Sequence, residues 1–368
     1  MQSVRLMIPG PVPISESTQA ALGSPIIAHY GREWAVLYNE TMQKLSRIFQ
    51  TNGSVICIVG SGTAALEAAV ASCVAPRETL VVLSNGFFGD RIIEIAKSHQ
   101  IHVIPVFTPP KEAHDPEALE TLLRKAPRVA AVAVVHCETS TGVLNPVKDL
   151  ALVAHEFGVP IIVDAISSLG GVEFRMDEWH IDICVSASQK ALQAPPGLAL
   201  IGVAKTAWTY IHSRSSPGWY LNLNTWKYYA DKWYDWHPHP TTMSTPLILA
   251  LRQAVNEILA EGLEKRFERH QSMSNVVRSR LAEIGFEPFT NRSIASPTLV
   301  VMKPNAKTNI SVDWVVNELY NRYKIKIAKG LGPTEGQAFR IGMMGLQATQ
   351  EYVDAVVAAF IDLMKGGK

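Results

Sequence analysis

The sequence predicts an α/β protein in which a mostly parallel, seven-stranded sheet is covered on both faces by helices and is followed by a small α+β domain. Short apolar runs alternate with helical patterns through most of the chain. Turns that contain glycine or proline separate these runs, as expected for successive strand–helix units. The last third of the chain changes to long helical patterns with isolated strands between them, which marks the smaller domain.

The length of 368 residues allows more than one domain. Apolar residues make up 47% of the chain and charged residues 18%, which is typical of a globular protein and not of a disordered one. The start of the chain, 1–14, is predicted to be an extended arm because its prolines cannot continue a helix. We expect 15–255 to form the large domain and 256–368 the small one.

Charge and hydropathy exclude several classes of protein. The net charge of +1 and the lack of a basic run argue against nucleic-acid binding. No apolar run reaches the roughly 18 residues of a membrane span, and the N-terminus lacks the apolar core of a signal peptide. Four cysteines without CxxC spacing are expected to be buried thiols in a reducing compartment: Cys57, Cys73, Cys137 and Cys184. We therefore expect a cytoplasmic protein without a membrane partner.

The order of elements follows from the periodicity of apolar residues. The predicted strands of the large domain are 55–59, 79–83, 101–106, 129–135, 160–163, 181–186 and 198–203. The predicted helices between and before them are 33–49, 64–74, 90–99, 116–125 and 147–157. In the C-terminal part, helices are predicted at 247–258, 263–284, 312–322 and 350–364, and strands at 294–302 and 324–328.

Polar and aromatic side chains follow the ends of the predicted parallel strands. In such sheets, ligands bind at the carboxyl ends of the strands, so these segments are expected to face one crevice. The segments are Gly60-Ser61-Gly62-Thr63, Asn85-Gly86-Phe87-Phe88, His136-Cys137-Glu138-Thr139, Asp164 and Ser188-Gln189-Lys190.

Lys190 follows the apolar strand 181–186 and precedes a proline-rich segment that cannot form an ordinary amphipathic helix. Desolvation beside a buried strand lowers the pKa of a lysine, and a neutral amine can attack a carbonyl to form a Schiff base. The alternative is a lysine that extends to the surface at the end of a strand.

The segment Gly60-Ser61-Gly62-Thr63 lies between a predicted strand and a predicted helix. Its backbone N–H groups and hydroxyls could hold a phosphate at the positive end of that helix. With Ala65 it also matches GxGxxA, a weak dinucleotide pattern. The next strand ends in Ser84, where a nicotinamide enzyme usually offers a carboxylate to the ribose, so a phosphate monoester fits better.

Two further residues of the crevice each allow two interpretations. Asp164 ends an apolar strand, and it either caps the following segment or keeps a ring nitrogen protonated through a charge-assisted hydrogen bond. Phe88 either packs in the core or stacks on a flat heteroaromatic ring.

Five segments together resemble the class V aminotransferases, and within them the alanine–glyoxylate and serine–pyruvate branch. They are Gly60–Thr63, Asn85–Arg91, His136–Gly142, Val163–Ser168 and Ser188–Lys190, and they occur in the order and spacing of that family. The resemblance covers nearly the whole chain. It implies the fold-type I scaffold and the cofactor pyridoxal 5′-phosphate.

The resemblance also implies a role for each position that matches the family pattern. Lys190 would carry the cofactor as a Schiff base and move the proton at the substrate Cα, and Asp164 would pair with the pyridinium nitrogen. The other residues assigned to the cofactor are Ser61, Gly62, Thr63 and Gln189 at the phosphate, Phe88 and Ile166 on the two ring faces, and Thr139 near the ring hydroxyl.

The segment 208–243 is dense in tryptophan and tyrosine, which is typical of a dimer interface or a pocket wall. The resemblance implies a homodimer in which this segment reaches the partner's cofactor phosphate through His239 and Thr242. His237 and His239 also suggest a metal site, but no cysteine or carboxylate accompanies them locally, so we expect no metal.

Arg340 lies in Phe339-Arg340-Ile341-Gly342, which resembles the family segment whose arginine binds the substrate α-carboxylate. A planar, bidentate donor suits carboxylate recognition, whereas the alternative is a surface arginine at the end of a strand. The resemblance also assigns Gly10 of the arm to the substrate.

The expected reaction is a two-stage, ping-pong amino transfer from alanine or serine to glyoxylate or pyruvate, with small amino and 2-oxo acids as partners. Pyridoxamine–pyruvate and ureidoglycine–glyoxylate transaminases are the alternatives on the same scaffold. A cysteine desulfurase would need a cysteine in the C-terminal half, and the last cysteine is Cys184. An NAD-dependent dehydrogenase would leave Lys190 and Asp164 without roles, and a regulator on this fold would carry an added DNA-binding module.

Overall fold

The larger lobe is built around a seven-stranded sheet in a computed structural model that describes residues 4–366 apart from 127, 215–217, 307 and 309. The strand order is β2-β10-β9-β8-β5-β3-β4. β10 is antiparallel to both of its neighbours and the other neighbouring pairs are parallel, so the predicted sheet is confirmed. The strands are β2 (Ser54–Val59), β3 (Thr79–Ser84), β4 (His102–Phe107), β5 (Ala131–Val135), β8 (Ile161–Asp164), β9 (Ile183–Ala187) and β10 (Leu198–Val203).

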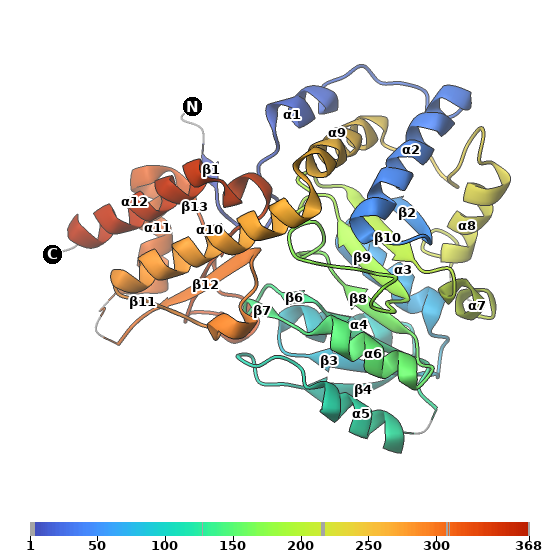
Figure 1. Ribbon diagram of the computed structural model, residues 1–368, viewed down its shortest axis with the longest axis horizontal. Helices are drawn as coiled ribbons and strands as arrows, with labels where there is room; N and C mark the ends of the chain where they lie inside the picture. The colour runs from blue at the N-terminus through green and yellow to red at the C-terminus, as the bar shows by residue number, and fades with distance from the viewer. Residues whose placement is uncertain (1–3, 127, 215–217, 307, 309, 367–368) are drawn as a thin grey trace.

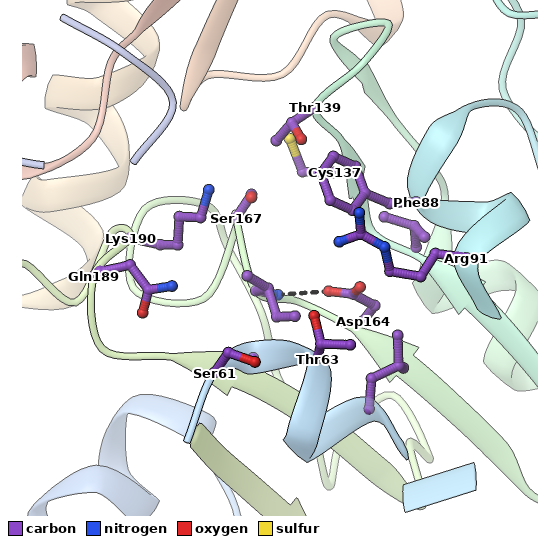
Figure 2. Close-up of a pocket in the computed structure, with 14 residues that line it drawn as sticks. Ser61, Thr63, Phe88, Arg91, Cys137, Thr139, Asp164, Ser167, Gln189 and Lys190 are labelled. Atoms are coloured by element: carbon purple, nitrogen blue, oxygen red, sulfur yellow. Dashed lines mark hydrogen bonds between the residues drawn. The ribbon is translucent and has the colours of Figure 1, made fainter. Parts of the chain in front are cut away.

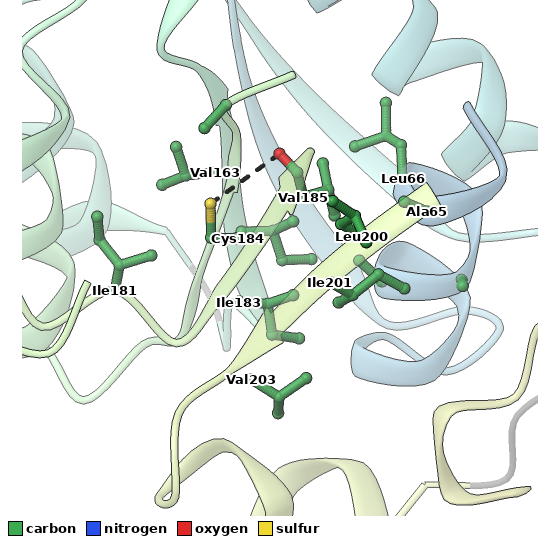
Figure 3. Packing of buried hydrophobic residues seen from close by; sticks show 14 of the residues in the cluster. Ala65, Leu66, Val163, Ile181, Ile183, Cys184, Val185, Leu200, Ile201 and Val203 are labelled. Atoms are coloured by element: carbon green, nitrogen blue, oxygen red, sulfur yellow. Dashed lines mark hydrogen bonds between the residues drawn. The ribbon is translucent and has the colours of Figure 1, made fainter. Parts of the chain in front are cut away.

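Helices cover this sheet because its central strands are apolar on both faces. All five residues of β5 and all six of β10 are buried. The covering helices are α2 (Arg32–Phe49), α3 (Gly62–Cys73), α4 (Phe87–Ser98), α5 (Pro116–Lys125) and α6 (Val147–Glu156). Figure 3 shows Ala65 and Leu66 of α3 beside Leu200 and Ile201 of β10, in the same core.

The smaller lobe has its own antiparallel sheet and its own core (Figure 1). Its strand order is β11-β12-β15-β14. The rings of Phe286, Phe339 and Phe360 meet in its centre, with centroids 5.2 to 5.4 Å apart. Its elements are α10 (Leu263–Glu283), β11 (Phe286–Pro288), β12 (Leu299–Pro304), α11 (Val312–Tyr323), β13 (Ile325–Lys326), β14 (Ala328–Lys329), β15 (Phe339–Gly342) and α12 (Gln350–Gly366).

The N-terminal arm connects the two lobes. Its strand β1 (Arg5–Leu6) pairs in parallel with β13, and the Gly342 N–H donates to the Met7 carbonyl over 2.7 Å. A few residues later, the Val12 N–H donates to the carbonyl of Gln189 over 3.1 Å. The arm therefore runs from the small lobe to the segment that carries Lys190.

Several elements differ from the sequence prediction. α4 begins at Phe87 and not at 90, because the buried Glu138 carboxylate accepts hydrogen bonds from the N–H groups of Phe88 and Gly89. The strand predicted at 294–302 begins only at Leu299, and a 3-10 helix, Arg292–Ile294, precedes it. The strand predicted at 324–328 is divided between β13 and β14, which belong to different sheets.

Short elements without a clear period were not predicted. They are α1 (Glu16–Leu22), β6 (Cys137–Glu138), β7 (Val143–Leu144), α7 (Ala207–His212) and α8 (Leu223–Lys232), in addition to β11 and β15. The helix α9 (Thr245–Glu261) was predicted from 247 onward. The four cysteines are buried and free, as predicted. Within the described part of the chain, no helix is both long and apolar enough to cross a membrane.

Candidate active site

A pocket opens at the carboxyl ends of the parallel strands, where the sequence predicted a crevice. Its cavity volume is about 170 Å³, and it is lined by Ser61, Gly62, Thr63, Leu66, Phe88, Arg91, Val135, Cys137, Thr139, Asp164, Ile166, Ser167, Gln189 and Lys190. Figure 2 shows Lys190 and Gln189 on one side of the pocket, and Phe88 and Arg91 on the other with Asp164 below them. Strand ends far apart in the sequence thus meet in one cavity.

Lys190 points its amine toward the N-terminal arm. Its Nζ donates a hydrogen bond to the Pro9 carbonyl, and its stem packs against Gly10. A Cβ at Gly10 would lie 2.5 Å from Lys190 Cδ, and the φ angle of +90° also favours glycine there. Burial, with a smaller contribution from the Arg340 guanidinium, lowers the pKa of Lys190 to about 8. A substantial fraction of the amine is therefore neutral near physiological pH.

Asp164 lies at the end of β8, below the centre of the pocket. One of its oxygens accepts a hydrogen bond from the Ile166 N–H over 2.9 Å, the dashed line in Figure 2. Burial raises the pKa of Asp164 to about 7, although the Ile166 N–H partly offsets this effect. The side chain forms no ion pair with another described residue, so a cationic donor from a bound molecule would stabilise its charged form.

The floor of the pocket has unfilled hydrogen-bonding capacity. Ser61 is the N-cap residue of α3, yet no side chain caps the N–H groups of the first turn. Oε1 of Gln189 is buried and finds no partner among the described residues. Thr63 adds a hydroxyl at the same helix end. Free donors at a helix N-terminus are typical of an anion site.

Two apolar side chains flank the space above Asp164. Phe88 and Ile166 both line the pocket, and Gly62 makes room for Ile166, since a Cβ at position 62 would lie 2.7 Å from Ile166 Cδ1. The Arg91 guanidinium stands 5.0 Å from the centre of the Phe88 ring. This arrangement fits a flat ring between Phe88 and Ile166.

Glu138 holds Phe88 in place from behind. Its Oε2 accepts from the Phe88 and Gly89 N–H groups over 2.9 and 3.1 Å, and its Oε1 accepts from both the N–H and the hydroxyl of Ser140. Burial nevertheless raises the pKa of the Glu138 carboxyl. Four donors on one buried carboxylate fix the start of α4 to the segment that carries Thr139.

Arg340 lies on β15 of the small lobe and faces the pocket without lining it. Its Nε donates to the Lys329 carbonyl over 2.9 Å and its Nη1 to the Thr139 carbonyl over 3.2 Å. Burial lowers the pKa of the guanidinium, and its positive charge contributes to the lowered pKa of Lys190. Arg340 therefore joins the two lobes close to the reactive amine.

His239 and Thr242 lie outside this pocket. His239 is fully buried, and both ring nitrogens have partners within the chain, the Trp34 indole N–H at 2.8 Å and the Thr241 carbonyl at 2.7 Å. Both nitrogens are thus occupied within the chain, and the role of His239 toward a partner's cofactor phosphate stays a prediction. Thr242 is exposed and remains available for such a contact.

Sequence reasoning missed Leu66, Arg91, Val135 and Ser167 as lining residues, whereas Cys137 belongs to a segment that was expected to face the crevice. Arg91 stands three positions after Phe88, so both lie on one face of α4. Val135, Cys137 and Thr139 alternate along an extended segment, and the period of two could have identified Val135.

Comparison with protein families gives an independent line of evidence. The family described as "Aminotransferase class-V" matches residues 15–356 of the chain. An alanine–glyoxylate aminotransferase from Callithrix jacchus is 32% identical over 369 residues, which cover 98% of this chain and 87% of that relative.

Solved structures are similar over the same extent. A ureidoglycine–glyoxylate aminotransferase from Bacillus subtilis superposes with a TM-score of 0.93 and 29% identity, covering 100% of this chain and 95% of that one. A pyridoxamine–pyruvate aminotransferase from Mesorhizobium loti gives the same TM-score with 28% identity, and the match covers 99% of this chain and 93% of that one.

Proposed function

The chain belongs to the class V aminotransferases, and we propose on this basis that it uses pyridoxal 5′-phosphate to move the amino group of alanine or serine to glyoxylate or pyruvate. The observation that carries the proposal is the meeting of Lys190 and Asp164 in one pocket with the open N-terminus of α3. These three features suit an aldehyde, a protonated ring nitrogen and a phosphate, respectively.

The residues of the pocket fit this cofactor. Asp164 is a buried carboxylate that would gain a cationic partner, and the first turn of α3 offers backbone N–H groups that the N-cap side chain leaves free. We assign the phosphate to Ser61, Gly62, Thr63 and Gln189, the ring faces to Phe88 and Ile166, and the neighbourhood of the ring hydroxyl to Thr139. When bound, the cofactor supplies an electron-withdrawing ring that stabilises negative charge at the substrate Cα.

Each residue then has a defined task. The neutral Nζ of Lys190 takes the proton from the substrate Cα and later returns it, which its lowered pKa allows. Asp164 stays ionised beside a cation and so keeps that cation protonated. Gly10 leaves space for the Lys190 stem to move, because any larger residue would collide with it.

The pH dependence of cofactor uptake tests the state of Lys190. Its pKa of about 8 lies below the usual value of about 10.4, so the neutral fraction rises from about one tenth at pH 7 to nearly all at pH 9. The rate at which apoprotein takes up pyridoxal 5′-phosphate, followed by visible absorption, is expected to rise about tenfold over this range and then level off. A rate that keeps rising to pH 10 would indicate an ordinary lysine.

Arg340 is assigned to the substrate carboxylate. Arg340→Gln removes a charge-assisted, bidentate donor, and we expect KM for both the amino acid and the 2-oxo acid to rise about 30-fold, or about 2 kcal/mol. Arg340→Lys keeps the charge without the planar geometry and should recover only part of the loss. The exposed Arg322, substituted by Gln, is the matched control. Unchanged KM values would place the carboxylate elsewhere.

The choice of substrates is tested by a panel of donors. Alanine, serine, ureidoglycine and free pyridoxamine are each offered with glyoxylate and with pyruvate, and kcat/KM is measured for each pair. Alanine or serine with glyoxylate or pyruvate should be fastest. A preference for pyridoxamine or ureidoglycine would favour the alternatives that the two solved structures represent.

We also propose that the protein is a homodimer with shared active sites. Large aromatic side chains are exposed on and near α8, including Trp219, Tyr228, Trp236 and Tyr30, with exposures of 49% to 55%. Such side chains are enriched in interfaces. Sedimentation equilibrium measures the oligomeric state directly.

A further inference from the structure

Three histidines from two distant parts of the chain meet beside the start of α2. His29 precedes that helix, whereas His237 and His239 follow α8. One nitrogen of each ring lies within 4.8 Å of a nitrogen of the other two. We propose that His29, His237 and His239 bind a divalent transition-metal ion of the zinc class. This site is separate from the active-site pocket, and the proposal does not depend on the proposed reaction.

The first pair of nitrogens already has the spacing of metal ligands. Nε2 of His237 and Nδ1 of His29 are 3.2 Å apart. Zinc–nitrogen bonds of about 2.0–2.1 Å in tetrahedral geometry place two ligand nitrogens about 3.3 Å apart. The same distance allows a hydrogen bond between the two rings, and a metal ion can take the place of its proton.

The third histidine is oriented as metal-binding histidines usually are. Nδ1 of His239 faces the Thr241 carbonyl at 2.7 Å, so it carries the proton and leaves the lone pair on Nε2. A hydrogen bond from the second ring nitrogen to a backbone carbonyl is the usual support of a histidine ligand. The lone pair of Nε2 now accepts from the Trp34 indole at 2.8 Å, and coordination requires that this bond give way.

The cluster lies largely away from solvent, since His237 and His239 are both buried. Aromatic rings enclose the cluster: the ring centres of Tyr38 and His239 are 5.2 Å apart, and those of Trp236 and His237 are 5.4 Å apart. An apolar shell of this kind limits access of water to a bound ion.

Nitrogen ligands indicate the class of ion. Imidazole suits zinc, copper, iron and nickel, whereas calcium and magnesium prefer oxygen ligands. Three histidines with water in the fourth position form a known type of zinc site. The bound ion would join the segment before α2 to the segment after α8, which the hydrogen bond from the Gly31 N–H to the Trp236 carbonyl already brings together.

The test uses the untagged, full-length protein with its cofactor, dialysed against a chelator and then titrated with Co²⁺ or Zn²⁺. We expect one ion per chain by elemental analysis, and a visible Co²⁺ spectrum of tetrahedral, nitrogen-ligated type. His29→Gln removes one of the three proposed ligands, a half-buried side chain. Loss of a residue that only hydrogen-bonds a metal ligand weakens metal binding roughly 10- to 100-fold, so we expect a larger loss of metal affinity in this variant. His102→Gln, at an exposed histidine, is the matched control and should bind as the unchanged protein does.

Two results would overturn the proposal. One is stoichiometry well below one ion per chain in the unchanged protein. The other is equal affinity in His29→Gln and in the unchanged protein, which would place the ion elsewhere. A thermal melt without metal shows whether His29→Gln is folded. His237→Gln provides a second ligand variant, and each reading is independent of transaminase activity.

Discussion

Lys190→Ala is expected to abolish transamination, with kcat reduced by at least about four orders of magnitude. The substitution removes the amine that captures the cofactor and the group that moves the proton at the substrate Cα. General acid–base catalysis alone contributes about 10²–10⁴-fold, and the covalent role adds to it. Single-turnover kinetics with alanine and glyoxylate measures the loss, and borohydride reduction followed by peptide mass spectrometry measures cofactor attachment at position 190.

The control for this prediction is Lys205→Ala, at an exposed lysine of the large lobe. It should keep both activity and cofactor attachment. Small primary amines added to Lys190→Ala are expected to restore part of the proton transfer, because the cavity left by the side chain admits them. Full transamination by Lys190→Ala would exclude Lys190 as the catalytic amine.

Asp164→Asn is expected to have the second largest effect. Asparagine has nearly the same shape and still accepts a hydrogen bond from Ile166, but it cannot stabilise a protonated ring nitrogen. Removing one partner of a buried, hydrogen-bonded charge pair costs about 2–5 kcal/mol, so kcat should fall roughly 30- to 4,000-fold. Steady-state kinetics at saturating cofactor separates this effect from weaker cofactor binding.

The variant Asp164→Asn is also a control for the pH dependence of the apoprotein. Because burial raises the pKa of Asp164 to about 7, the apoprotein should show a carboxyl that ionises near neutrality. In Asp164→Asn this ionisation disappears, while the folded apoprotein should lose no stability, since the raised pKa of Asp164 costs stability as the pH rises from the ordinary value of 3.8 to about 7. A cofactor affinity equal to that of the unchanged protein would exclude a cationic partner for Asp164.

Strong periodicity explains why most of the large lobe could be predicted. The helix α5 has the predicted bounds, 116–125, because proline, an acidic N-cap and a clear apolar stripe define it. The strands β3, β5 and β8 are short apolar runs between turns, which is the pattern expected for a buried parallel sheet. The end of β8 then places Asp164, and the end of β9 places Lys190.

Tertiary contacts account for what could not be predicted. The start of α4 depends on Glu138, which is distant in sequence, and no local signal at Phe87 reveals this cap. The aromatic segment that contains α7 and α8 lacks a regular apolar period, so its helices were not identified. The resemblance implied that His239 reaches a partner's cofactor phosphate, whereas the structure buries its imidazole against Trp34, a contact that no local pattern reveals.

The histidine cluster also depends on a contact between residues that are distant in sequence. His237 and His239 were visible in the sequence, but His29 is separated from His237 by 208 positions. An expectation based on neighbouring residues therefore found no third ligand.

The N-terminal arm has a mechanical consequence. It is bonded to β13 and β15 at one end and to Gln189 at the other, and between these points the Pro9 carbonyl accepts the Lys190 amine. Any rotation of the small lobe that moves Arg340 must also move the N-terminal arm. A displacement of β15 would therefore also shift the arm residues that contact the Lys190 amine.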